Sequence, residues 1–158
     1  MRANKTLAGW LCGAALAMVQ TCAPAVPVLA QVHPRTAIVA VGDTAAPSND
    51  VATAGALHDA ITRELPLTSN IRLATGHDAR WVVRGAVTQL SRDTVADGLE
   101  VHCAVSLVVA DARGGAVRVL LHGRASARGD DGDALTDLAL SAAVRSALRP
   151  LGGALGAL

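Results

Sequence analysis

The stretch LEVHCAVSLVVADARGGAVRVLL, residues 99–121, decides the fold because it reads as two β-strands joined by a tight turn. An alternating strand points one set of side chains to each face of a sheet, and a glycine-containing turn after Asp111 reverses the chain. The sequence therefore predicts an antiparallel hairpin with one buried face. The apolar residues expected on that face are Leu99, Val101, Cys103, Val105, Leu107, Val109, Val117, Val119 and Leu121.

The segment before this hairpin predicts a third strand and completes a meander. Residues 80–90 alternate in the same way, with Trp81 and Val83 on one face and Arg84 on the other. Residues 91–97 are polar and predict the turn that leads into the hairpin.

The N-terminal flank of the meander predicts a strand followed by a helix. Residues 35–41 form a continuous apolar run, which is typical of a strand buried on both faces. Apolar residues then recur at three- and four-residue spacing from Val51 to Leu65, which indicates an amphipathic helix. Asn49 or Asp50 is expected to cap its start.

A second helix is predicted over residues 134–151, with an acidic cluster at its start. The helix dipole favours negative charge at this end, so we expect the cluster to cap the helix. A calcium loop of the EF-hand type would need a glutamate at its twelfth position, and this run has none. The cluster consists of Asp130, Asp131, Asp133 and Asp137.

With a short strand over residues 70–74, the predicted order is β-α-β-β-β-β-α. This order indicates the α+β class, with a mixed, mostly antiparallel sheet and two helices packed mainly on one face. Residues 31–151 are expected to form a single domain, and residues 152–158 a flexible tail.

The first thirty residues read as a secretory signal peptide. Arg2 and Lys5 precede an apolar run, and the segment closes on Ala30 before Gln31, so we predict cleavage there and a periplasmic or secreted protein. The apolar run is shorter than the roughly 20 residues of a spanning helix. Cys22 sits in a poor lipobox and leaves open the alternative of a lipoprotein anchored in the outer membrane.

The composition after residue 30 limits the function classes. Loss of the basic residues Arg2 and Lys5 leaves 12 arginines, no lysine and 13 acidic residues, so the domain is close to neutral and gives no electrostatic reason to bind nucleic acid. Trp81 is then the sole aromatic residue, which argues against stacking platforms. Cys103 is the sole cysteine, so the core must hold without an internal disulfide.

Two segments resemble bacterial envelope domains. The first is DARWVVRGAV, residues 78–87, which matches a strand pattern of Asp and Ala before an aromatic residue, followed by apolar residues and Gly. The second is VSLVVADARGG, residues 105–115, which matches an apolar strand followed by Asp and a Gly-containing turn. Both patterns are shared by the lipoprotein activators of penicillin-binding proteins, the curli secretion subunit and the N-terminal domain of the Tol–Pal propeller protein. The resemblance covers most of residues 35–151.

What this resemblance implies is a fold. Gly85 and Asp111 are structural matches, and no functional residue is carried over. The chain departs from the group in its poor lipobox, its scarcity of aromatic residues, and a first strand without the Pro-Phe that often ends it.

No catalytic motif stands out, so we expect neither an enzyme nor a cofactor. The even-numbered residues of the meander share the face opposite the apolar one, and we take this face as a candidate partner surface. The alternative is a metal-binding protein or small hydrolase using two histidines that the hairpin would bring side by side. The residues of the candidate surface are Arg84, His102, His122 and Arg124.

These observations favour an exported, non-catalytic envelope protein that binds another envelope protein or assembles as a homo-oligomer. Its mature chain is expected to lack a transmembrane helix, with a lipid anchor at Cys22 as the alternative to free release. Cys103, in the apolar row, is expected to be a buried, unreactive thiol.

Export of the full chain predicts a mature protein that begins at Gln31. N-terminal sequencing and intact mass of the protein from a fractionated cell envelope would check this. A mature chain that begins at Cys22 with the added mass of acyl chains would contradict cleavage at Ala30 and favour the anchored form.

Overall fold

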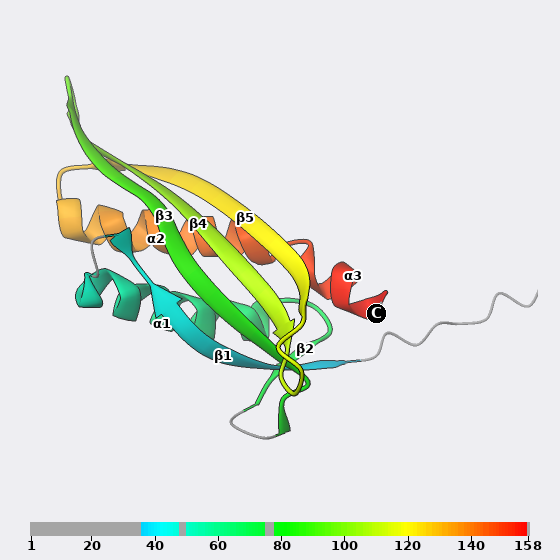
Figure 1. The fold of residues 1–158 in the computed structure, drawn as a ribbon. Helices are drawn as coiled ribbons and strands as arrows, with labels where there is room; N and C mark the ends of the chain where they lie inside the picture. Colours follow the sequence, from blue (N-terminus) through cyan, green and yellow to red (C-terminus); the bar gives the residue numbers. More distant parts are fainter. Residues whose placement is uncertain (1–35, 48–49, 75–77, 158) are drawn as a thin grey trace, which may run out of the picture. The chain divides into compact units, whose positions relative to one another are not determined.

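The computed structural model describes residues 36–47, 50–74 and 78–157 (Figure 1). The predicted signal peptide, its cleavage site at Ala30 and Gln31, and Cys22 lie outside these residues. The elements, in chain order, are β1 (Ala37–Ala45), α1 (Val51–Glu64), the 3₁₀ turn η2 (Leu65–Leu67), β2 (Ile71–Leu73), β3 (Trp81–Val95), β4 (Gly98–Asp111), β5 (Val117–Gly129), α2 (Gly132–Leu148) and α3 (Leu151–Gly156).

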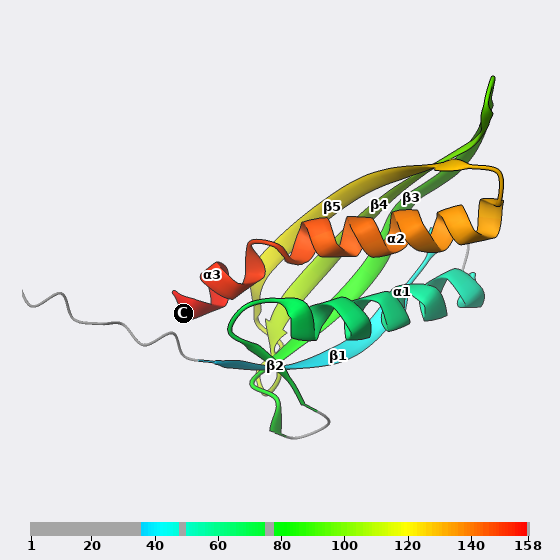
Figure 2. The ribbon, with the colours of Figure 1, turned by 180° about the vertical axis from the view of Figure 1, so that it is seen from behind.

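The strands form one five-stranded sheet in the order β2-β1-β3-β4-β5. Strand β1 runs parallel to both β2 and β3, whereas β3, β4 and β5 form an antiparallel meander. Helices α1 and α2 lie side by side on one face of this sheet, in front of the strands in Figure 2 and behind them in Figure 1. The predicted α+β class, mixed sheet and one-sided helix layer are confirmed.

The core forms between the alternating apolar face of the meander and the two helices. Val101, Val105, Leu107 and Val109 of β4 are fully or almost fully buried, as the hairpin pattern predicts. Burying an aliphatic side chain of this size contributes roughly 1.5–3 kcal/mol. The remaining members come from all the larger elements, among them Val39, Leu57, Ile61, Val83, Leu121, Leu140, Val144 and Leu148.

Two glycines allow the helices to approach the sheet closely. A Cβ at Gly85 of β3 would lie 2.7 Å from Cδ1 of Ile61 on α1. A Cβ at Gly123 of β5 would meet the carbonyl oxygen of Ala143 and lie 2.8 Å from the backbone nitrogen of Ala147, both on α2. Gly85 is one of the two residues that carry the resemblance in sequence, and its structural reason is this contact.

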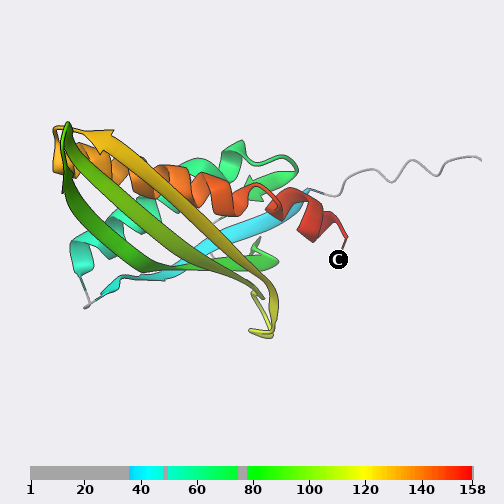
Figure 3. The same ribbon diagram turned by 90° about the horizontal axis from the view of Figure 1, so that it is seen from above.

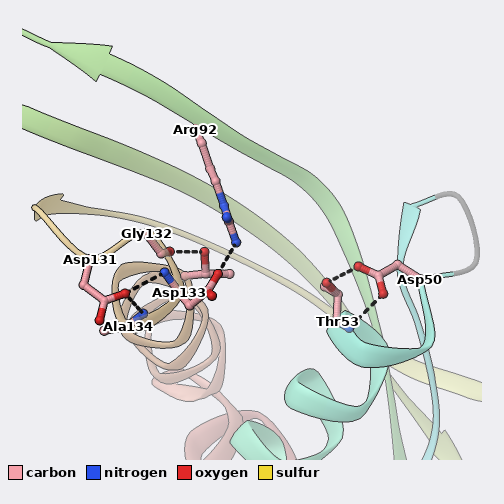
Figure 4. A network of polar contacts seen from close by, with 8 residues as sticks. Asp50, Thr53, Arg92, Asp131, Gly132, Asp133 and Ala134 are labelled. Carbon is pink, nitrogen blue, oxygen red and sulfur yellow. Dashed lines mark hydrogen bonds and ion pairs between the residues drawn. The ribbon is translucent and has the colours of Figure 1, made fainter.

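Aspartates cap both helices at the same end of the domain (Figure 4). The Asp50 carboxylate accepts hydrogen bonds from the backbone N–H groups of Ala52 (3.0 Å) and Thr53 (3.4 Å) and from the Thr53 hydroxyl (2.6 Å). These bonds lower the pKa of Asp50, since they favour its charged form. Asp131 accepts from the N–H groups of Asp133 (3.1 Å) and Ala134 (3.2 Å), so the predicted capping role of the acidic cluster is confirmed.

An ion pair with one buried partner joins α1 to α2. Glu64 is 5% exposed, and its two carboxylate oxygens accept hydrogen bonds from Nε (2.9 Å) and Nη2 (2.8 Å) of Arg145. This two-bond geometry fixes the orientation of both side chains and holds the pKa of Glu64 below its ordinary value.

The structure corrects two predictions about the first strand and helix. Strand β1 is not buried on both faces, because the helix layer covers one face alone; Val39 is its one fully buried residue. Val51 begins α1 as predicted but is 84% exposed, and the buried stripe starts at Leu57.

Two boundaries also differ from the prediction. The polar segment 91–97 continues β3 to Val95, because its side chains are exposed or half-buried on both faces of the strand, and the turn is confined to Ala96 and Asp97. Residues 152–158 are not a structureless tail over most of their length. Leu151 and Leu155, one helical turn apart, are both buried and organise α3.

Replacing Gly123 by alanine is expected to lower the free energy of unfolding by about 1–3 kcal/mol, because the new Cβ overpacks the contact with α2. Gly55 on α1 is the matched control: its Cβ would meet nothing within 4 Å, so alanine there should raise stability by about 0.5–1 kcal/mol. Urea unfolding of both variants would check this. A neutral Gly123→Ala would contradict the close approach of β5 and α2.

Replacing Arg145 by methionine keeps the alkyl stem and removes the partner of Glu64. We expect a loss of stability at pH 7 that is smaller than for a fully buried pair, because the guanidinium is largely in solvent. Since the folded-state pKa of Glu64 lies below 4.5, its contribution is complete above that pH and is lost as pH falls through the folded value. Unfolding at pH 7 and pH 3 should show the difference shrink in acid, and Arg149→Met serves as the exposed control.

A loss of the same size at both pH values would contradict an electrostatic role for Arg145. It would leave packing of the side-chain stem as the origin of the effect.

Candidate functional site

The face of the sheet opposite the helices is the candidate site. Within the described residues, no helix lies over it (Figure 1). Figure 3 shows the same arrangement from above, with α1 and α2 on one side of the curved strands. We call this surface the uncovered face.

Pairing across β3, β4 and β5 arranges the uncovered face in rows. Five of these rows, in order toward the β3–β4 turn, are Arg84–Val108–Leu120, Ala86–Ser106–His122, Gln89–Ala104–Arg124, Ser91–His102–Ser126 and Asp93–Glu100–Arg128. The four residues of the candidate surface, Arg84, His102, His122 and Arg124, therefore lie on one face but in four different rows.

The two histidines are not side by side, and that prediction is wrong. His102 is opposite Ser126, and His122 is opposite Ser106. The β4–β5 register thus separates them by four positions along the strands, or roughly 13 Å. Within residues 36–47, 50–74 and 78–157, no group of three or more His, Cys, Asp or Glu side chains is placed to hold a metal ion.

Charges at the end of the uncovered face next to the β3–β4 turn neutralise one another. Glu100 accepts a hydrogen bond from Arg128 at 2.8 Å, and this bond lowers the pKa of Glu100. Nε2 of His102 lies 3.8 Å from a carboxylate oxygen of Glu100 and 3.9 Å from one of Asp93. His102 is therefore engaged with carboxylates and not with His122.

Farther from the β3–β4 turn, the uncovered face carries cationic groups without such partners. Among the described residues, neither Arg84 nor Arg124 has a carboxylate within ion-pair distance, and both side chains are exposed. Leu120, in the row of Arg84, is 56% exposed. An exposed apolar side chain that shares a face with unpaired guanidinium groups has the composition of a protein-binding surface.

A shallow groove of about 360 Å³ crosses the uncovered face at Ala104. The small Ala104 side chain forms its floor, while a bulge at Thr88 shifts β3 so that Gln89 takes the place opposite Ala104. The Thr88 hydroxyl donates to the Ala104 carbonyl oxygen at 3.1 Å and fixes this bulge. The groove is lined by Gln89, His102, Cys103, Ala104, Arg124, Ala125 and Ser126.

The bulge and its groove were not predicted. A signal exists in the sequence, because Thr88 and Gln89 are two consecutive polar residues within the segment 80–90, which was predicted to alternate. An extra residue in one strand would explain the break in period.

Cys103 is 3% exposed, and burial raises the pKa of its thiol to about 11. The thiolate is the nucleophilic form, so this cysteine is poorly suited to covalent chemistry near neutral pH. Its side chain belongs to the buried row of β4, as the alternation predicts, while His102 beside it points to the other face.

Near the helix caps, a second groove lies between α1 and α2. Arg92 of β3 reaches it and donates to Asp133 at 3.1 Å (Figure 4). This groove is lined by Ala52, Thr53, Ala56, Arg92, Asp133, Thr136, Asp137 and Leu140. In the part of the chain that the structure describes, no helix combines the length and the apolar character that crossing a membrane requires.

No protein-family model matches the chain, and no curated protein matches it either. Solved structures do share the fold. A hypothetical protein from Chlamydia trachomatis aligns with a TM-score of 0.59 at 14% identity, over 78% of this chain and 99% of that one. A PelC dodecamer from Paraburkholderia phytofirmans aligns with a TM-score of 0.58 at 20% identity, over 75% and 90% of the two chains.

A protein from Xanthomonas campestris described as DUF330 aligns with a TM-score of 0.51 at 11% identity, over 79% of this chain and 89% of that one. At these identities the likeness shows the fold alone. The three names differ from the groups that the sequence motifs resemble, so the resemblance holds at the level of the fold.

Proposed function

We propose that the protein is an exported, non-catalytic domain of the bacterial envelope that binds another protein through the uncovered face of its sheet. The observation that carries the proposal is the exposed Leu120 on the same face of the sheet as the unpaired Arg84 and Arg124. Guanidinium groups present several donors in one plane, which suits carboxylates on a protein partner.

Two further observations support this reading. The signal-peptide pattern of residues 1–30 favours a position outside the cytoplasm, either free after cleavage at Ala30 or anchored through Cys22. PelC, whose fold this chain shares, was solved as a dodecamer, so the fold is compatible with assembly into a homo-oligomer.

The polar groups of the uncovered face suit recognition better than catalysis. His102 lies between two carboxylates, the Cys103 thiol is buried behind the sheet, and the groove over Ala104 is shallow and open. A catalytic base would need a nucleophile within hydrogen-bond reach, and among the described residues no hydrogen bond joins His102 to Ser91 or Ser126, its neighbours in the row.

Reversing the charges of Arg84 and Arg124 to glutamate should abolish partner capture, because carboxylates would then face carboxylates. Tagged mature protein would be cross-linked in the cell envelope, and captured proteins identified by mass spectrometry. The double variant Arg113→Glu/Arg149→Glu makes the same change in net charge away from the uncovered face and should capture the same partners as the original chain. Equal capture by the Arg84/Arg124 variant would remove this face from consideration.

A further inference from the structure

We propose that the outer edge of β5 binds an acidic segment of another protein in extended conformation, which adds to the sheet as a further strand. This inference rests on the proposed function, because it names how the partner engages the side of the sheet on which Arg124 lies. We call the outward backbone of residues 119–129 the β5 edge.

The β5 edge is regular and unpaired. Strand β5 is the last strand of the sheet, and β4 is its one partner among the described residues (Figure 1). From Val119 to Gly129 its register with β4 continues without a shift, and this stretch contains no proline. In an antiparallel pair, every second residue directs its N–H and C=O groups away from the partner strand.

These outward groups are available to another strand. Within the described part of the chain, no backbone hydrogen bond outside the β4–β5 ladder reaches residues 119–129. A row of unpaired N–H and C=O groups is a template on which an extended peptide can pair.

The two edges of the sheet differ in how pairing is prevented. Strand β2, at the opposite edge, has only three residues. Proteins protect sheet edges by short strands, prolines, bulges or charged side chains. The β5 edge has neither a proline nor a bulge, so side-chain charge is what restricts the strands that can pair with it.

The charge of β5 is positive along its whole length. The strand contains three arginines and one histidine but no acidic residue. Arg128 is neutralised by Glu100, whereas Arg118 and Arg124 have no carboxylate within ion-pair distance among the described residues.

An added strand would bring every second side chain beside the exposed side chains of β5 on the uncovered face. Opposite charges at facing positions of neighbouring strands stabilise the pair, and like charges destabilise it. The strand that fits therefore carries a carboxylate beside Arg124. The exposed side chains on this side of β5 are Leu120, His122, Arg124, Ser126 and Arg128.

The groove over Ala104 adds donors for that carboxylate. Its polar lining includes Gln89 and Ser126 besides Arg124, and no acidic residue belongs to it. An ionised carboxylate accepts hydrogen bonds and donates none, so a lining that offers an amide, a hydroxyl and a guanidinium matches it.

The same charges disfavour a second copy of this chain at the β5 edge. Two β5 strands paired with each other would bring together cationic and neutral side chains in every register, because neither has an acidic residue. The β2 edge of a second copy would present the exposed Arg72 on a strand of three residues. The occupant that the chemistry selects is therefore a different, acidic chain.

A synthetic peptide tests the choice of charge. A capped, fluorescent peptide of alternating glutamate and threonine should bind the mature chain in anisotropy measurements, and the same peptide with lysine for glutamate should not. Arg124→Glu should weaken binding of the glutamate peptide by roughly tenfold or more, because it places like charges opposite each other. Arg72→Glu makes the same change in net charge at the opposite edge of the sheet and should leave the affinity unchanged.

Backbone pairing is tested separately from charge. The glutamate peptide with N-methylated amides keeps its carboxylates but loses its backbone donors, so it should not bind. With the unmodified peptide, amide hydrogen exchange should become slower in residues 119–129 and stay unchanged in residues 71–73. Circular dichroism confirms that each variant is folded.

Three results would each overturn the proposal: no binding of the glutamate peptide, equal binding of its N-methylated form, or unchanged affinity of Arg124→Glu. Self-association of the original chain in sedimentation velocity, with slower exchange in residues 119–129, also overturns it and makes a second copy the occupant.

The proposed function fails or stands on a different measurement. If the peptide does not bind, the proposed function still stands when the original chain captures an envelope protein that the Arg84/Arg124 variant loses. The partner would then contact the uncovered face without adding a strand. Equal capture by that variant rejects the proposed function whatever the peptide does.

Discussion

The close approach of two helices to an aliphatic sheet is the constraint on which this domain depends. Its core has one aromatic side chain, Trp81, so the volume between the layers must be small to be filled. The distance between the helices and the sheet is kept short by Gly85 and Gly123 on the strands and by Ala139, Ala143 and Ala147 on α2. Interiors are packed like organic crystals, and a gap of one methyl group between such layers would leave unfilled space.

Because both helices pack on one face of the sheet, the side chains of the other face are not covered by a second layer. Side chains of the even-numbered positions of β4 meet no second layer, yet Ala104 and Ala110 are buried there because longer neighbours close over them. On the uncovered face, small side chains therefore lie close to the strands, and the longer arginine and histidine side chains project beyond them. Where the side chains are small, another molecule can approach the strands closely.

Much of the fold could be predicted from the sequence, because the alternation from Leu99 to Leu121 has a single consistent reading. The helix caps at Asp50 and Asp131 could also be predicted, because a capping carboxylate bonds to backbone N–H groups only two or three residues away. Register and close packing could not be predicted in the same way. The separation of His102 from His122 depends on which residues pair across the turn, and the alternating pattern alone does not set that.

The candidate site was predicted in part for the same reason. Sharing a face follows from counting along a strand, so Arg84 and Arg124 could be placed together on one side of the sheet. Whether each has an ionic partner depends on residues distant in sequence. Arg92 and Arg145 look similar to them in sequence, but they are engaged by Asp133 and Glu64, which α2 and α1 bring within reach.

The only lysine of the chain is Lys5, within the predicted signal peptide, so every basic side chain in the folded domain other than histidine is an arginine. A guanidinium does not lose its proton in proteins, whereas an ammonium can become neutral when it is desolvated at an interface. The positive charge of the uncovered face is therefore permanent on the alkaline side of neutrality. A protein exposed to an exterior whose pH the cell does not regulate would keep the same electrostatic surface as its surroundings become more basic.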